Sequence, residues 1–162
     1  MSYRFAISTL SEILKVVNDG ERGFALCAAH AQSHELRDAF SAAAIRYAAA
    51  AAELRTLLER LGWDPAVHRA AWLAPRRAWQ QLRTILALND DEALVELCGR
   101  GEDHALEVYR NALDDPLPEF VRPVVLRQFE SVMSEHPQMR VEPEERVAGT
   151  MPFASEGGHA RS

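Results

Sequence analysis

The chain has 162 residues, of which 48% are hydrophobic and 26% charged, a balance typical of one globular domain with a real core. Its net charge is −6 and its basic residues are scattered, so a broad nucleic-acid-binding surface is excluded, because such a surface needs clustered Lys and Arg. We find no secretory signal and no apolar run long enough to cross a membrane. The sequence therefore predicts a cytoplasmic protein with neither nucleic acid nor membrane as partner.

The first predicted helix starts at a capping box formed by Thr9 and Glu12 and runs to about Ala31. Apolar residues recur on one face at helical spacing: Leu10, Ile13, Leu14, Val17, Phe24 and Ala28. Glu21 falls on that same face, directly after Gly20. A carboxylate among packed side chains is costly unless a cation, a proton or hydrogen-bond donors compensate it. Glu21 is therefore expected to have a polar partner.

A second helix is predicted from Ser33, as its N-cap, to Gly62, as its C-terminal cap. Its inner face carries Leu36, Phe40, Ala43, Tyr47, Ala50, Leu54, Leu57 and Leu61. Because only a few residues separate the first two helices, we expect them to be antiparallel neighbours.

A long connection, residues 63–89, follows and contains a short predicted helix that begins near Pro75 and carries Trp79. Asn89 or Asp90 then caps a third long helix, which runs to about Leu113. Glu102 lies on the apolar face of this helix, directly after Gly101. The third helix thus repeats the glycine-glutamate pattern of the first.

A fourth helix is predicted after the Pro-rich turn at residues 115–118, with Pro123 kinking or delaying its first turns. Its inner side carries Val121, Val125, Gln128, Phe129, Val132 and His136. Beyond Pro137 the composition changes to Glu, Pro, Gly and Ser. We expect a bundle over residues 1–139 and a polar tail over residues 140–162.

The length of the connection decides the topology that we expect. A segment of about 20 residues with a helix inside it can travel the bundle's length, roughly 30 Å. The second and third helices then run parallel, as in bundles with one crossover. The sequence therefore predicts an all-α, ferritin-like, up-down-down-up four-helix bundle with a helical crossover between helices two and three.

In that topology Glu21 and Glu102 lie at a common depth, roughly 15 Å and 18 Å from the end of the bundle that holds the first hairpin. Tyr47 on the second helix and Gln128 on the fourth reach the same level. We predict a buried polar cluster of these four residues with Arg46 at its edge. Glu53 is expected a couple of turns lower, facing Glu12 or Arg110.

Four short motifs occur in order along the chain. They are Asn18-Asp19-Gly20-Glu21-Arg22-Gly23-Phe24, Glu53-Leu54 followed by Arg60-Leu61-Gly62, Arg100-Gly101-Glu102-Asp103 before Tyr109, and Arg127-Gln128-Phe129 before His136. Together they resemble an uncharacterised, mostly proteobacterial family of ferritin-like four-helix bundles, a domain of unknown function. The resemblance covers residues 10–136 and implies a fold more than an activity. The chain departs from it at Arg76, where a histidine is expected, and at Pro137, where the last helix usually continues.

A carboxylate-bridged di-metal site needs two single glutamates plus two Glu-x-x-His pairs. Glu21 and Glu102 supply the single glutamates, but both pairs are missing, since Met133 stands three residues before His136. A full di-metal centre is therefore not expected. A reduced site for one divalent metal ion, iron or manganese, remains an alternative, with Glu21, Glu102 and Gln128 or His104 as ligands.

Two hypotheses about function thus stay open, and neither names a catalytic residue. The first is a non-catalytic protein that acts through self-association into a homo-oligomer, or through partner binding, around the buried polar cluster. The second is a metal-binding protein that uses Glu21 and Glu102. Cys27 and Cys98 both fall on apolar faces and are expected to be buried free thiols.

Overall fold

The structure is a computed structural model that describes residues 3–65 and 79–135. Within these ranges every regular element is helical: α1 (Arg4–His30), α2 (His34–Arg60), α4 (Leu82–Leu86), α5 (Asp91–Leu113) and a further helix over residues 122–135, here called the last helix. The predicted all-α class is confirmed. None of the described helices combines the length and apolarity needed to span a bilayer.

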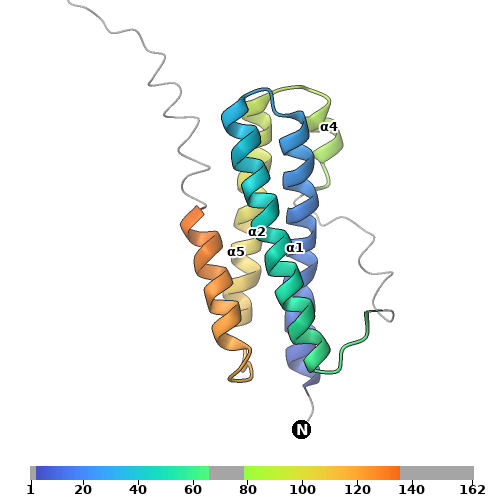
Figure 1. The fold of residues 1–162 in the computed structure, drawn as a ribbon, viewed down its shortest axis with the longest axis vertical. Coiled ribbons are helices and arrows are strands. Elements are labelled where there is room, and N and C mark those ends of the chain that lie inside the picture. Colours follow the sequence, from blue (N-terminus) through green and yellow to red (C-terminus); the bar gives the residue numbers. More distant parts are fainter. Residues whose placement is uncertain (1–2, 66–78, 136–162) are drawn as a thin grey trace, which may run out of the picture.

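The long helices lie side by side, and two contacts show which ends meet (Figure 1). The backbone N–H groups of Gln32 and Ser33, in the turn between α1 and α2, donate to the two carboxylate oxygens of Asp91 at 2.8 Å each. At the opposite end, the Thr9 hydroxyl donates to Asp115 at 2.9 Å. Consequently α2 and α5 begin at the same end of the bundle, and α1 begins where α5 ends.

The start of α1 differs from the prediction. The helix begins at Arg4, with Tyr3 as an N-cap whose side chain makes no capping hydrogen bond, so the predicted start at Thr9 is wrong. The Thr9 hydroxyl bonds to Asp115 instead of capping a helix. The buried face extends back to Ala6, and packing therefore carries the helix past the apparent capping box.

The predicted caps of α2 and α5 are confirmed, whereas α4 begins only at Leu82, so Trp79 precedes that helix instead of lying on it as predicted. The Ser33 hydroxyl accepts from the Leu36 N–H at 3.3 Å, which caps α2, and Gly62 ends that helix with a φ of 92°. The Asp90 carboxylate accepts from the Glu92 N–H at 3.0 Å and caps α5.

The last helix is attached to the end of α5 by one arginine. The Arg122 guanidinium donates to the carbonyls of Leu113, at 2.9 Å, and Asp115, at 2.6 Å. Pro123 stands in the first turn, where a helix makes no use of the N–H that proline lacks. The predicted delay at Pro123 is therefore confirmed.

Trp79 fills the space between α1 and α5, and two glycines make room for it. A Cβ atom added at Gly23 on α1 would lie 2.5 Å from the indole ring, and one added at Gly101 on α5 would lie 2.3 Å from it. The ring also meets Phe24 edge to face, with centroids 5.6 Å apart. We call this packing the tryptophan contact.

Several predictions fall on residues outside the described ranges. They concern Pro75 and Arg76 in the connection, His136 and Pro137, and the boundary at residue 139 with the tail beyond it.

Candidate functional site

On the other side of α5 lies a pocket of about 370 Å³ between α2, α5 and the last helix. Its walls come from three elements: Arg46, Tyr47, Ala49, Ala50 and Glu53 on α2, Glu102 and Tyr109 on α5, and Arg127, Gln128, Ser131 and Val132 on the last helix. We call it the polar pocket. Alanines on α2 leave the space open, because they bring helix backbone but little side chain to the wall.

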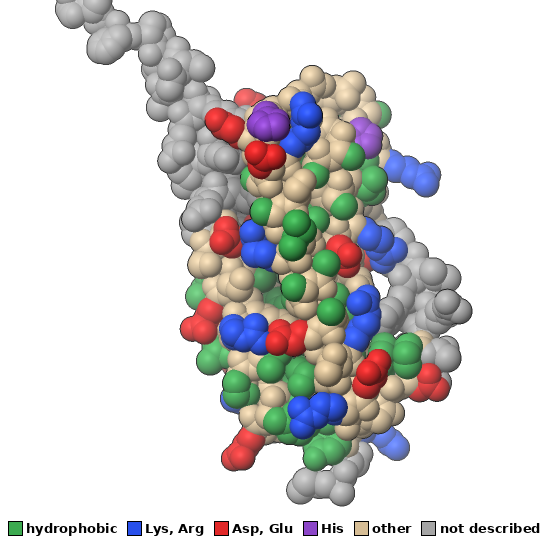
Figure 2. Space-filling model, in the orientation of Figure 1, with side chains coloured by type: hydrophobic (Ala, Val, Ile, Leu, Met, Phe, Trp, Pro, Cys, Tyr) green, Lys and Arg blue, Asp and Glu red, His purple; other side chains and the backbone are tan. Residues whose placement is uncertain are grey.

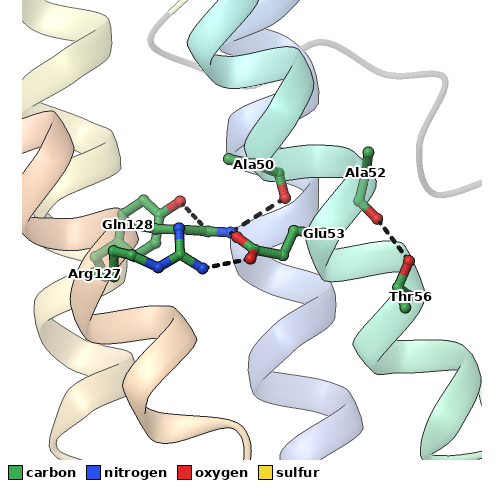
Figure 3. Close-up of polar contacts among 7 residues, drawn as sticks. Ala50, Ala52, Glu53, Thr56, Arg127 and Gln128 are labelled. Carbon is green, nitrogen blue, oxygen red and sulfur yellow. Dashed lines mark hydrogen bonds and ion pairs between the residues drawn. The ribbon is translucent and has the colours of Figure 1, made fainter.

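Gln128 is buried and organises one wall of the polar pocket (Figure 3). Its Oε1 accepts from the Tyr109 hydroxyl at 2.7 Å, while its Nε2 donates to Glu53 at 2.8 Å and to the Ala50 carbonyl at 3.3 Å. Arg127 pairs with the second oxygen of Glu53. This network joins all three walls and holds the amide of Gln128 in one orientation.

Glu102 is the deepest charged group of the polar pocket, with a relative exposure of only 1%. Burial raises the pKa of its carboxyl to about 7, although Arg46 opposes the rise. Glu135 and Asp103 raise the pKa further, and hydrogen bonding from Tyr47 lowers it. Glu102 therefore changes its charge near neutral pH, as acid-base and ligand-binding groups commonly do.

The two tyrosines of the polar pocket keep their protons at neutral pH. Burial, with the nearby Glu102, raises the pKa of Tyr47 well above its ordinary value. Burial and Glu53 likewise raise the pKa of Tyr109. Gly20 on α1 lets the Tyr47 ring approach, since a Cβ there would lie 3.0 Å from it. Both hydroxyls thus keep a proton that they can donate, and the Tyr109 hydroxyl donates it to Gln128.

The family model described as Domain of unknown function (DUF2383) matches residues 5–115, more than half of the chain. The chain belongs to this family. The expected membership of a family of unknown function is thereby confirmed, and no curated protein matches the chain. The DUF2383 match spans α2, α4, α5 and nearly all of α1, whereas the last helix lies beyond it.

Of the predicted cluster in this DUF2383 chain, four residues line the polar pocket: Arg46, Tyr47, Glu102 and Gln128. The fifth, Glu21, is half-buried on α1 and is not among the lining residues. The reason is that α1 meets α5 on its other side, through the tryptophan contact.

Glu53 was expected to face Glu12 or Arg110, and this prediction is wrong. Its carboxylate accepts from Gln128 and pairs with Arg127, both on the last helix. Glu12 instead pairs with Lys15 at 3.3 Å on its own helix. A signal for the true partner was present, since Arg127 and Gln128 adjoin in the sequence and Glu53 lies almost one helical turn beyond Ala50.

Three helical glycines have a packing role that was not predicted from the sequence. Gly20, Gly23 and Gly101 lie inside helices, where glycine costs about 1 kcal/mol relative to alanine. Such a glycine usually has a packing reason, and here each admits an aromatic ring, Tyr47 or Trp79. The glycines, more than the glutamates beside them, explain the glycine-glutamate pattern on α1.

Cys27 and Cys98 are buried and free, as predicted. Burial and a hydrogen bond with Cys27 raise the pKa of the Cys98 thiol well above its ordinary value. Among the described residues, no group of three or more His, Cys, Asp and Glu side chains is arranged to hold a metal ion. The metal site of Glu21, Glu102 and Gln128 stays a prediction.

Proposed function

We propose that this chain is a ferritin-like four-helix bundle that binds a small molecule in the polar pocket and catalyses no reaction. One observation carries the proposal: Tyr47, Glu102, Tyr109 and Gln128 are buried, come from three helices and converge on one pocket of about 370 Å³. Pockets of this volume, with few polar groups and apolar walls, commonly bind small ligands.

The helix directions support the ferritin-like part of the proposal. Because α2 and α5 both begin at the end where Asp91 meets Ser33, the chain between them returns along the bundle. Figure 1 shows the last helix running back from the other end, beside α5. One long return with two tight hairpins is the topology of ferritin-like bundles.

The chemistry of the lining residues favours recognition over reaction. Both tyrosines remain protonated, and the amide of Gln128 is held by three hydrogen bonds. These groups can orient a ligand through donors and acceptors. They supply no activated nucleophile.

A blocking variant tests the proposal on the full chain. Ala49 lines the polar pocket and is exposed, so Ala49→Trp should fill the mouth without disturbing the core. Ala42→Trp, two turns away on the same exposed face, is the matched control. A set of small fragments is screened by ligand-detected NMR. Binding that is lost with Ala49→Trp and kept with Ala42→Trp supports the proposal. Fragments that bind equally well to both variants, or to neither protein nor variant, refute it.

The metal-binding alternative rests on oxygen donors in the same pocket. Glu53, Glu102 and Gln128 all line it, and carboxylate and amide oxygens are ligands for hard divalent ions. Equilibrium dialysis against Mn²⁺ or Fe²⁺, with Glu102→Gln and Glu21→Gln as variants, tests it. Stoichiometric metal that both substitutions remove supports the predicted ligand set, whereas metal that survives Glu21→Gln argues against it.

Self-association is also part of our proposal, through the exposed face of α2. Ile45 on this face is 70% exposed. Its neighbours at helical spacing are Ala42, Ala49 and Ala52, all exposed. Figure 2 shows hydrophobic side chains along the middle of the face that carries α2, with charged side chains at its edges and ends.

The charges along α2 suit a second copy of the chain. Each end of the helix carries exposed charges of both signs, with Glu35, Arg37 and Asp38 near its start and Arg55, Glu59 and Arg60 near its end. In a pair whose twofold axis is perpendicular to α2, the two copies of this helix run antiparallel, and the acidic side chains at the start of one can pair with the arginines at the end of the other. Light scattering should give twice the chain mass, and Ile45→Lys should halve it. A monomer at all concentrations would contradict this part of the proposal.

A further inference from the structure

The charged side chains of the polar pocket differ in how deeply they are buried. Glu102 is 1% exposed, whereas the side chains of Arg46 and Arg127 are 33% and 61% exposed. The carboxyl is therefore at the floor and the guanidinium groups at the rim. Electrostatic interactions strengthen where water is excluded, so the floor decides which ligand charge is favoured.

The rim charges already have carboxylate neighbours. Arg127 pairs with Glu53, and Arg46 lies 3.9 Å from Glu135. Both pairs connect α2 to the last helix across the mouth of the pocket. An anion entering the pocket would have to compete with these carboxylates and then approach Glu102, so the rim does not favour an acidic ligand.

Besides Ser131 and the hydrogen-bonded amide of Gln128, the remaining walls are apolar or aromatic. Ala49, Ala50 and Val132 present alkyl groups, and Tyr47 and Tyr109 present rings. Aromatic faces attract cations, and alkyl walls accommodate a short hydrocarbon body. A bare metal ion would use neither.

We infer that the polar pocket takes a small organic cation, a primary ammonium on a short apolar chain, whose ammonium group meets the carboxylate of Glu102. The inference rests on the proposed binding function and adds the class of ligand. The hydrocarbon part lies against Ala49, Ala50 and Val132, and the ammonium donates hydrogen bonds at the floor.

The pH dependence follows from the charge that Glu102 must carry. Because the pKa of the Glu102 carboxyl is about 7, an ammonium ligand displaces a proton at pH values below 7. The groups that act on Glu102 or line the pocket with it are Arg46, Tyr47 and Glu53 on α2, Cys98, Asp103 and Tyr109 on α5, and Arg127 and Glu135 on the last helix. Affinity should rise roughly 30-fold from pH 5.5 to pH 8, the change in the ionised fraction of a group with that pKa.

The test compares three probes of similar size and different charge: n-butylammonium, 1-butanol and butanoate. Each is titrated into the full ¹⁵N-labelled chain and followed by amide chemical shifts at pH 8. We expect butylammonium to bind at least tenfold more tightly than the other two. Glu102→Gln, a substitution of the same shape, should abolish that preference. Glu107→Gln, at an exposed residue of α5 that does not line the pocket, should preserve it.

Every other outcome overturns either the cation inference or the proposed binding function. Equal or tighter binding of butanol or butanoate overturns the cation inference and leaves the binding pocket standing. A preference for butylammonium that survives Glu102→Gln also overturns it. Binding of no probe, by the chain or by the variants, overturns the proposed function itself. Circular dichroism of each variant, with a helical signal equal to that of the parent chain, ensures that a lost preference is not lost folding.

Discussion

Two sides of one helix differ sharply at consecutive residues of α5. Gly101 faces the tryptophan contact, a dry side where an indole ring fills the space to Gly23 on α1. Glu102 faces the polar pocket, where α2 and the last helix are joined by polar side chains and space remains. Neighbouring helical residues point about 100° apart. On one side of α5, a glycine lets an aromatic ring fill the space between two helices. On the other side, hydrogen-bonded polar side chains surround a cavity.

The largest loss of stability is expected when the indole ring of the tryptophan contact is removed. Trp79→Ala removes a ring that is 6% exposed and packed against Phe24. The free energy of unfolding should fall by about 3–5 kcal/mol, the usual cost of deleting a buried aromatic side chain. Urea unfolding followed by circular dichroism measures it. A loss of unfolding free energy below about 1 kcal/mol would show that the Trp79 ring does not hold α1 and α5 together.

The next largest loss of stability is expected when a methyl group is added at the tryptophan contact. Gly101→Ala places a Cβ 2.3 Å from the indole ring, and Gly23 on α1 packs against the same ring from the other side. Overpacking of this kind should lower the free energy of unfolding by about 1–3 kcal/mol, despite the helix propensity of alanine.

Gly99→Ala is the matched control for that variant, because nothing lies within 4 Å of its added Cβ. It should raise stability by about 0.5–1 kcal/mol. In a Trp79→Ala background, Gly101→Ala should become stabilising as well. If both glycines respond alike while Trp79 is present, the tryptophan contact does not explain Gly101.

The pocket side should respond to pH. Because the pKa of Glu102 is about 7 when folded and 4.5 ordinarily, the folded state binds this proton more tightly. Its stabilising effect is complete below pH 4.5 and is lost as the pH rises through 7. Glu102→Gln should therefore be more stable than the parent chain at pH 8, by on the order of 1–3 kcal/mol, and this advantage should shrink toward pH 4.5. Urea midpoints across that range measure it, and a pH-independent difference would contradict the buried carboxyl.

The smallest expected effect concerns the hydrogen bond that joins α5 to the last helix. Tyr109→Phe leaves the buried Gln128 Oε1 without its donor at 2.7 Å and should cost about 1–2 kcal/mol. Arg127→Ala breaks an ion pair on the exposed rim and should cost less than about 1 kcal/mol. Thermal unfolding of both variants, measured together, should place Tyr109→Phe lower in midpoint. The reverse order would mean that the rim holds the last helix more strongly than the network inside.

Local chemistry predicted most helix boundaries. Ser33, Gly62 and Asp90 act through their nearest backbone neighbours, so their roles can be inferred from a few residues. Thr9 misled because its hydroxyl bonds to Asp115, a residue distant in sequence, and no short-range pattern contains that contact.

For the candidate site, the sequence predicts which helix face each residue lies on and its level along the bundle, but not which residues it contacts. Helical periodicity placed Tyr47, Glu102 and Gln128 inward at one level, and they do line one pocket. Periodicity cannot say which neighbour an inward face meets. Whether Glu21 or Glu53 approached Gln128 depended on how each helix is rotated, and that rotation is set by packing over the whole bundle, including the position of Trp79.

The bond from Asp91 to the turn between α1 and α2 bears on the order of folding events. Those two helices are adjacent in sequence and can zip together early through local contacts. The amides of Gln32 and Ser33, however, receive their carboxylate only when α5 docks, 58 residues further along from Ser33. We therefore expect the turn of this hairpin to gain its last hydrogen bonds late in folding, from a segment that lies far along the chain.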